Sequence, residues 1–233
     1  MSIVVSWSGG KDCNLAFYLA TQQGLDVRCL ITAVDHTGRM GAHALKPSVL
    51  SKQAEAIGVP LLVLPVTVST YDDDFREQLQ LLKKTGVHGA VFGDVDLGNC
   101  EAKLHRGWIE SICNPIDITA FIPLWFLDRE TILRKLIDLG FDVRFVVVDD
   151  ANFSPEWLGK KLDNYVIDEL KSRAERSPEG KVGYYHTIVL DGPIFKKRLR
   201  VVNSDKVHKS DEWGDNWYWD ISSCCLEDKV FTK

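Results

Sequence analysis

Residues 3–20, IVVSWSGGKDCNLAFYLA, decide the fold that we expect for this chain. A β-branched apolar run ends at Trp7, the pentapeptide SGGKD follows at 8–12, and an amphipathic pattern then runs to about Gln23. The order strand, glycine-rich turn and helix is typical of the first unit of an α/β protein. We therefore expect a parallel sheet whose first strand begins almost at Met1.

The same alternation continues through the first two-thirds of the chain. Nearly continuous apolar stretches predict further strands at 27–34, 61–66, 89–94 and 142–149. Amphipathic stretches predict helices at 48–58, 71–86, 101–113 and 129–140. Buried parallel strands separated by helices indicate a Rossmann-like, doubly wound α/β sheet covered on both faces.

The pattern changes after residue 150. We expect a helix over 154–175, a hairpin over 184–202 that turns at 191–193, and a last strand at 216–221. The chain is accordingly divided into an α/β domain at 1–150 and a smaller α+β part at 151–233. Aromatic residues interleaved with acids near the last strand favour packing of a sheet face, for example in a homodimer.

Composition limits the possible functions. A chain of 233 residues with 45% hydrophobic and 26% charged residues can bury a sizeable core, and its net charge of −5 disfavours a general nucleic-acid binder. Since no apolar run is long enough for a membrane span and no signal peptide is recognisable, we expect a cytoplasmic protein. The six cysteines show neither a C-x-x-C pair nor zinc-type spacing, which indicates reduced thiols.

The SGGKD turn has the chemistry of a phosphate site. Glycines at the carboxyl end of a strand let backbone N–H groups approach an anion, and the N-terminus of the next helix adds a favourable dipole. Lys11 would add a positive charge. The turn is not a Walker A loop, because Val5 stands where a glycine is required and Asp12 where Ser or Thr is. The plainer alternative is a tight turn with an exposed lysine.

The pentapeptide resembles the pyrophosphate loop of the ATP pyrophosphatase (PP-loop) superfamily. Further segments resemble, in order, the diphthine–ammonia ligase-like family: HALKPSVLSKQAEAIGVPL (43–61), VFGDV (91–95), HRGWIESIC (105–113), PLW (123–125), LIDLGFDVRFVVVD (136–149), WLGKKLD (157–163) and YYHTIVLDGPIFKK (184–197). The resemblance covers almost the full length. It implies an adenine nucleotide alpha hydrolase-like domain followed by a substrate-binding portion.

One stretch departs from the family pattern. Members typically carry a G-E-x-G-E-[YF] run before the strand that contains His186, whereas this chain has PEGKVGYYHT at 178–187, with Glu179 as the remaining acid. His186 and Thr187 resemble the branch that is widespread in bacteria.

The resemblance implies an ATP-dependent ligase that adenylates a carboxylate, releases pyrophosphate and uses ammonia to form an amide and AMP. It implies ATP and Mg²⁺ as cofactors and a carboxylate-bearing acceptor, on a protein or a small molecule, as partner. Ser8, Gly9, Gly10 and Lys11 would hold the phosphates, while Asp12 would contact Mg²⁺ or fix the loop. The simpler structural alternative is that Asp12 caps the helix that follows.

Other candidates follow from their positions. His43 would meet the base or ribose of the nucleotide, and His186, on a strand remote in sequence from the loop, would move a proton to or from ammonia. The residues expected at the acceptor are Gly93, Asp94, His105, Trp108, Trp125, His186 and Thr187. Turn caps, a surface histidine beside a core tryptophan, and a structural histidine are the competing interpretations.

Two other functions stay open at this point. A PP-loop sulfur-transfer enzyme of the RNA-thiolation type would use Cys13 or Cys100 as the sulfur carrier. A regulator that binds ATP or AMP without cleaving it would need only the loop.

Overall fold

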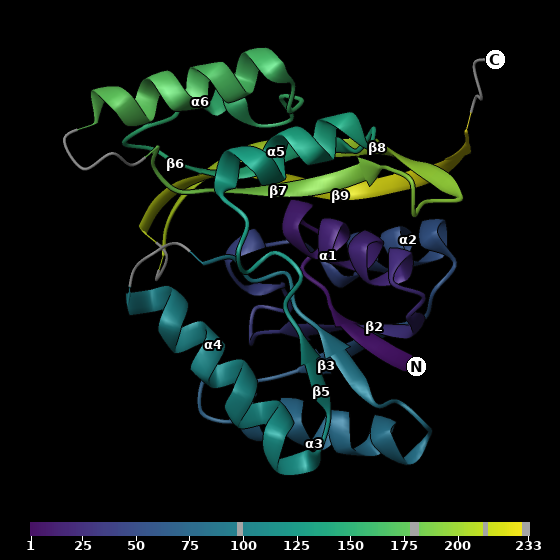
Figure 1. Ribbon diagram of the computed structural model, residues 1–233. Coiled ribbons are helices and arrows are strands. Elements are labelled where there is room, and N and C mark those ends of the chain that lie inside the picture. The colour runs from purple at the N-terminus through teal and green to yellow at the C-terminus, as the bar shows by residue number, and fades with distance from the viewer. Residues whose placement is uncertain (97–99, 178–181, 212–213, 230–233) are drawn as a thin grey trace.

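Two β-sheets, with one pair of helices between them, form the framework of the protein (Figure 1). The computed structural model describes residues 1–96, 100–177, 182–211 and 214–229. None of the helices in these ranges is long and apolar enough to cross a membrane.

The first sheet is parallel and has the strand order β3-β2-β1-β4-β5. Its strands are β1 (Ser2–Ser6), β2 (Asp26–Val34), β3 (Leu61–Pro65), β4 (Gly89–Val91) and β5 (Thr119–Phe121). The chain runs outward from β1 to β3 and then returns to the other side of β1, so the order reverses between β1 and β4. This arrangement confirms the doubly wound α/β fold, and ligands of such folds bind at the carboxyl ends of the strands at that reversal.

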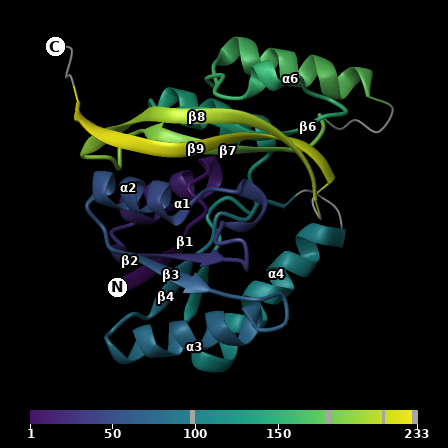
Figure 2. The same ribbon diagram turned by 180° about the vertical axis from the view of Figure 1, so that it is seen from behind.

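Helices cover both faces of the parallel sheet (Figures 1 and 2). The helices α1 (Lys11–Gln22) and α2 (Pro47–Ile57) lie on one face, and α3 (Tyr71–Lys84) and α4 (Cys100–Cys113) lie on the other. Helix α3 has acids in its first turn and lysines in its last, as the helix dipole favours. Helix α2 ends at Gly58, whose φ of +82° suits a glycine cap.

The second sheet is antiparallel and has the order β7-β6-β9-β8. Its strands are β6 (Asp142–Asp149), β7 (Tyr185–Asp191), β8 (Lys197–Asp211) and β9 (Gly214–Asp228), and α5 (Arg129–Asp138) and α6 (Asn164–Arg176) accompany it. It lies on the side of α1 and α2 away from the first sheet (Figure 2). One apolar core joins both parts, because Leu15 and Leu50 belong to the same buried cluster as Phe145 and Ile188.

The antiparallel pairing corrects two sequence predictions. The stretch 142–149 is a strand, but it pairs with β7 and β9 rather than joining the parallel sheet. The expected hairpin over 184–202 is wrong, because β7 pairs with β6 and β8 pairs with β9. An apolar run indicates that a strand is buried, but it does not specify the neighbouring strand.

The predicted helix over 154–175 is also wrong in its first half. Pro155–Trp157 form one 3-10 turn, and α6 begins only after Asp163, whose side chain accepts a hydrogen bond from Val166 N. Gly159, with a φ of +80°, interrupts the helical path between these two elements. The short strand β5 was not predicted, because its three residues are too few to show a period.

Candidate functional site

The pentapeptide 8–12 forms a closed turn at the carboxyl end of β1. Gly10 N donates a hydrogen bond to Ser8 Oγ at 3.3 Å, and Ser8 Oγ donates to Cys13 Sγ at 3.4 Å. The Cys13 thiol donates to Gly10 O at 3.2 Å, and Asn14 Nδ2 donates to the same oxygen at 2.7 Å. These bonds fix the turn at the N-terminus of α1, which carries the positive end of the helix dipole.

Close approach makes glycine necessary at three points around this turn. A Cβ at Gly9, whose φ is +78°, would lie 2.5 Å from Gln53 Oε1. A Cβ at Gly10 would lie 2.6 Å from His43 Nε2. Gly93, just after β4, would place a Cβ 2.6 Å from Cys13 N, so β4 ends directly against the first turn of α1. The role of Gly93 in the structure is therefore close packing beside the loop.

The second sheet completes the loop through β7, one of its edge strands. Val189 N donates to Gly9 O at 3.0 Å, and Lys11 N donates to Thr187 Oγ1 at 3.1 Å. An edge strand has unpaired backbone groups on its outer side, and here the loop uses them. His186 thus lies on a strand that is remote from the loop in sequence and contacts it in the structure. Because the edge of β7 lies against the loop, side chains from both faces of the strand, such as His186 and Thr187, lie beside it.

Gln53 joins β7, the loop 8–12 and the residue that follows β1, and it was not among the predicted site residues. Its Nε2 donates to Gly9 O at 2.9 Å and to Val189 O at 2.7 Å, while its Oε1 accepts from Trp7 Nε1 at 3.2 Å. The side chain is fully buried. A signal existed, since a glutamine on the apolar face of an amphipathic helix must find buried hydrogen-bond partners.

Lys11 and Asp12 form an ion pair of 2.7 Å beside the loop. Burial lowers the pKa of Lys11, but Asp12 and Tyr185 outweigh it, so the pKa lies above its ordinary value and the ammonium stays charged. The ammonium also lies 5.4 Å from the centre of the Tyr185 ring. The loop therefore keeps a permanent positive charge whose nearest partner is one carboxylate.

His43 and His186 contact each other above Gly10. Their ring centres are 4.2 Å apart, with the planes tilted by 45°. Burial and the charge of Lys11 lower the pKa of His43 to about 3, and burial, His43 and Lys11 lower that of His186 well below its ordinary value. His186 Nε2 is buried without a hydrogen-bond partner among the described residues. Such an atom fits a polar ligand in the site.

The cysteine next to the loop is a thiol, not a thiolate. Burial raises the pKa of Cys13, and its hydrogen bonds with Ser8 only partly offset this effect. The side chain of Cys100 and residue Glu179 lie outside the part of the chain that the structure describes.

Asp94 and His105 form a second polar pair, at the end of β4. Asp94 Oδ1 lies 3.1 Å from His105 Nδ1, and the histidine is exposed. Trp108 lies one turn further along α4. Its indole packs against Phe75 and Phe92 and donates to Asp72 Oδ1 at 2.7 Å. The structure thus places His105 at the surface and Trp108 in an aromatic cluster.

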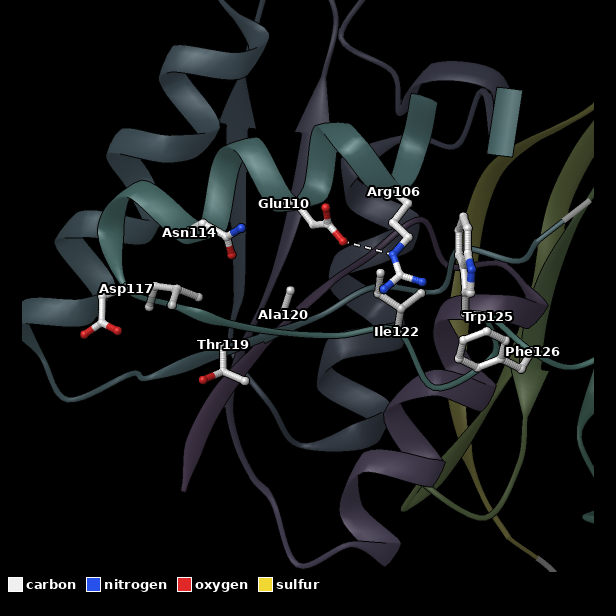
Figure 3. Close-up of a pocket in the computed structure, with 10 residues that line it drawn as sticks. Arg106, Glu110, Asn114, Asp117, Thr119, Ala120, Ile122, Trp125 and Phe126 are labelled. Carbon is white, nitrogen blue, oxygen red and sulfur yellow. Dashed lines mark hydrogen bonds and ion pairs between the residues drawn. The ribbon is translucent and has the colours of Figure 1, made fainter. Parts of the chain in front are cut away.

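Trp125 lies elsewhere, at the rim of a cavity of about 530 Å³ along β5 and α4 (Figure 3). The guanidinium of Arg106 lies 5.5 Å from the centre of the indole, and Glu110 holds it at 2.9 Å. None of the residues that line the cavity belongs to the loop 8–12. Trp125 thus lines this cavity, while His43, His186 and Thr187 lie at the loop 8–12.

These residues fit a nucleotide. The glycine cradle, the charge of Lys11 and the unpartnered Nε2 of His186 together match a phosphate chain. Within the described ranges, no group of three His, Cys, Asp or Glu residues could hold a metal by itself. Asp12 fits Mg²⁺ only as one ligand of an ion that also binds phosphate oxygens, which is the usual arrangement for this ion.

Comparison with known proteins gives the family of the chain. The diphthamide synthase N-terminal domain matches residues 1–119, and the diphthamide synthase C-terminal domain matches residues 128–224. The human diphthine–ammonia ligase is 25% identical over 253 aligned positions, which cover 99% of this chain and 94% of the human protein. The mouse protein of the same name is 30% identical over 164 positions, which cover 68% of this chain and 59% of the mouse protein.

Two solved structures resemble parts of the fold. A predicted subunit of a tRNA methyltransferase from Methanocaldococcus jannaschii has a TM-score of 0.46 and 20% identity, covering 83% of this chain and 98% of that one. The U34-tRNA thiolase NcsA from Methanococcus maripaludis has a TM-score of 0.40 and 14% identity, covering 77% and 67%. The family matches extend over both sheets and include the loop, so the chain belongs to the diphthamide synthase family.

Proposed function

We propose that the protein is an ATP-dependent ligase that joins ammonia to a carboxylate, with release of pyrophosphate and AMP. The relatives called diphthine–ammonia ligase carry both substrates in their name, and the matched length extends over nearly the whole chain. The acceptor proposed here is a carboxylate of that kind. The observation that carries the proposal is the glycine turn at the head of α1, held closed by β7 and topped by two neutral imidazoles.

The first step places the phosphates in this turn. Gly10 N and the Ser8 hydroxyl would exchange their bonds within the turn for bonds to the β- and γ-phosphates, beside the backbone of Gly9. Lys11 would stabilise the charge that develops on pyrophosphate. A carboxylate oxygen of the acceptor attacks the α-phosphorus, and the bond to the β-phosphate oxygen breaks. Asp12 is the residue that would hold Mg²⁺, and the ion would supply charge neutralisation for the leaving pyrophosphate.

In the second step ammonia attacks the acyl carbon, and AMP leaves. The attacking nitrogen must lose one proton, and neutral His186 accepts it through its buried Nε2. On the acceptor side, Asp94 orients His105 at the end of β4, and Trp125 with Arg106 provides an apolar and cationic wall. The assignment of acceptor binding to residues 151–233, and the boundary at 150, stay predictions.

The test is cleavage of ATP between the α- and β-phosphates in the presence of ammonia and a diphthine-bearing acceptor. Lys11→Ala should lower AMP formation by at least about 100-fold, as loss of a positioned donor does, with an unchanged circular dichroism spectrum. Lys84→Ala, at the exposed end of α3, is the matched control and should keep wild-type turnover. Equal AMP formation by Lys11→Ala and wild type would remove the phosphate-loop role.

The sulfur-transfer alternative makes a different prediction. A sulfur carrier must react as a thiolate, whereas burial raises the pKa of Cys13 and raises that of Cys113 to about 11. We expect Cys13→Ser, Cys100→Ser and Cys113→Ser to retain AMP formation with ammonia. Complete loss of activity in a folded serine variant would favour sulfur transfer over amide formation.

A further inference from the structure

Two histidines from distant parts of the chain meet over the phosphate loop, and packing alone does not explain them. His43 comes from the 3-10 turn Gly41–His43, and His186 comes from β7. His43 Nε2 lies so close to the loop that a single added Cβ at Gly10 would be 2.6 Å from it. The ring centres of His186 and His43 lie 4.2 Å apart in a tilted contact, and His186 makes a T-shaped contact with Tyr184 at 4.6 Å. Both rings therefore border the space that the phosphates would enter.

The charged groups around His43 and His186 favour neutral imidazoles as long as no anion occupies the loop. Lys11 is the cation that acts on both imidazoles, and its ammonium is paired with Asp12 at 2.7 Å. Arg129, at the start of α5, acts on Lys11, and Tyr185 lies beside the same ammonium. Burial and Lys11 lower the pKa of His43, and burial, His43 and Lys11 lower that of His186, so both rings are held neutral.

A triphosphate bound in the loop would instead favour a protonated imidazole. Even with one Mg²⁺, it brings about two uncompensated negative charges, and Lys11 is already shared with Asp12. At about 5 Å and an effective dielectric constant of about 20, each charge raises the pKa of a neighbouring imidazole by roughly two. Two such charges offset most of the effect that burial and Lys11 exert on His43. Protonation of both rings is disfavoured, because they lie in contact and would repel each other.

We propose that His43 and His186 act as one proton-binding site that becomes cationic when the triphosphate enters the loop, so that nucleotide binding takes up close to one proton. The inference rests on the proposed function, since it needs the nucleotide in this loop. The proton is released again when pyrophosphate leaves. His186 is then neutral once more before ammonia reacts, which is the form that the second step requires.

The experiment is isothermal titration calorimetry of the full chain with the Mg²⁺ complex of a non-hydrolysable ATP analogue. It is done at pH 7.5, above the last pKa of a phosphate monoester of about 6, in several buffers of different ionisation enthalpy. The slope of the observed enthalpy against the buffer enthalpy is the number of protons taken up. The variants are His43→Gln, His186→Gln and both together. His88→Gln is the control at an exposed histidine on the amino side of β4.

Wild type and His88→Gln should take up between about 0.5 and 1 proton, the single variants less, and the double variant close to none. Equal proton numbers in wild type and the double variant would overturn the inference while leaving nucleotide binding intact. If the double variant does not bind the analogue, the proton numbers of the single variants are compared with that of the wild type instead, and equal numbers would overturn the inference. Failure of the wild type to bind the analogue would instead overturn the proposed function and the inference together.

Discussion

Replacement of Gly9 by alanine tests how tightly the phosphate loop is built. The residue has a φ of +78° and is surrounded, since an added Cβ would lie 2.5 Å from Gln53 Oε1 and 2.6 Å from Leu50 Cδ2. Neither neighbour can move easily, because both are fully buried and Gln53 is held by Trp7. A left-handed conformation costs an alanine roughly 1–2 kcal/mol, and overpacking adds about 1–3 kcal/mol. We expect Gly9→Ala to lose about 2–5 kcal/mol of unfolding free energy.

Gly24→Ala provides the matched comparison. Gly24 has nearly the same φ, +76°, but an added Cβ there would meet nothing within 4 Å. It should therefore lose only the conformational part, roughly 1–2 kcal/mol. Urea denaturation of both variants gives the difference, which should be about 1–3 kcal/mol. A difference below about 0.5 kcal/mol would show that the loop relaxes around the methyl group and that the close approach to Gln53 and Leu50 is not needed.

Gln53→Met should destabilise the protein by about 2–4 kcal/mol, because it leaves buried hydrogen-bonding groups without partners. The control Gln80→Met, on the exposed face of α3, should change stability by less than about 0.5 kcal/mol. Similar urea midpoints for the two variants would contradict the bridging role of Gln53. Acid should destabilise the nucleotide-free protein between pH 7 and 5.5. The pKa values of His43 and His186 are lowered by burial, to about 3 for His43, so the unfolded chain binds more protons as the pH falls through 6.5. The expected loss is roughly 1 kcal/mol for each histidine at pH 5.5, and it should be absent from the double glutamine variant. An equal loss in that variant would assign the acid sensitivity to other groups.

Local sequence determined much of this protein. Apolar runs and amphipathic stretches located β1 to β4 and α1 to α5, because the repeat of side chains along a helix or strand is a local property. The SGGKD pentapeptide predicted the turn between β1 and α1 for the same reason: its conformation depends on two glycines and on the helix that starts at Lys11. The match of segments along the chain also identified the family before any geometry was known.

The tertiary structure decided which elements meet. The strand at 142–149 was found correctly but assigned to the wrong sheet, since a buried apolar strand satisfies a parallel or an antiparallel neighbour equally well. The contact between β7 and the loop, the bridge made by Gln53 and the ring contact between His43 and His186 all join segments far apart in sequence. Local sequence patterns do not predict such long-range contacts. They form because the edge of β7 and the loop each have backbone groups that must be paired once α1 and α2 are buried between the two sheets.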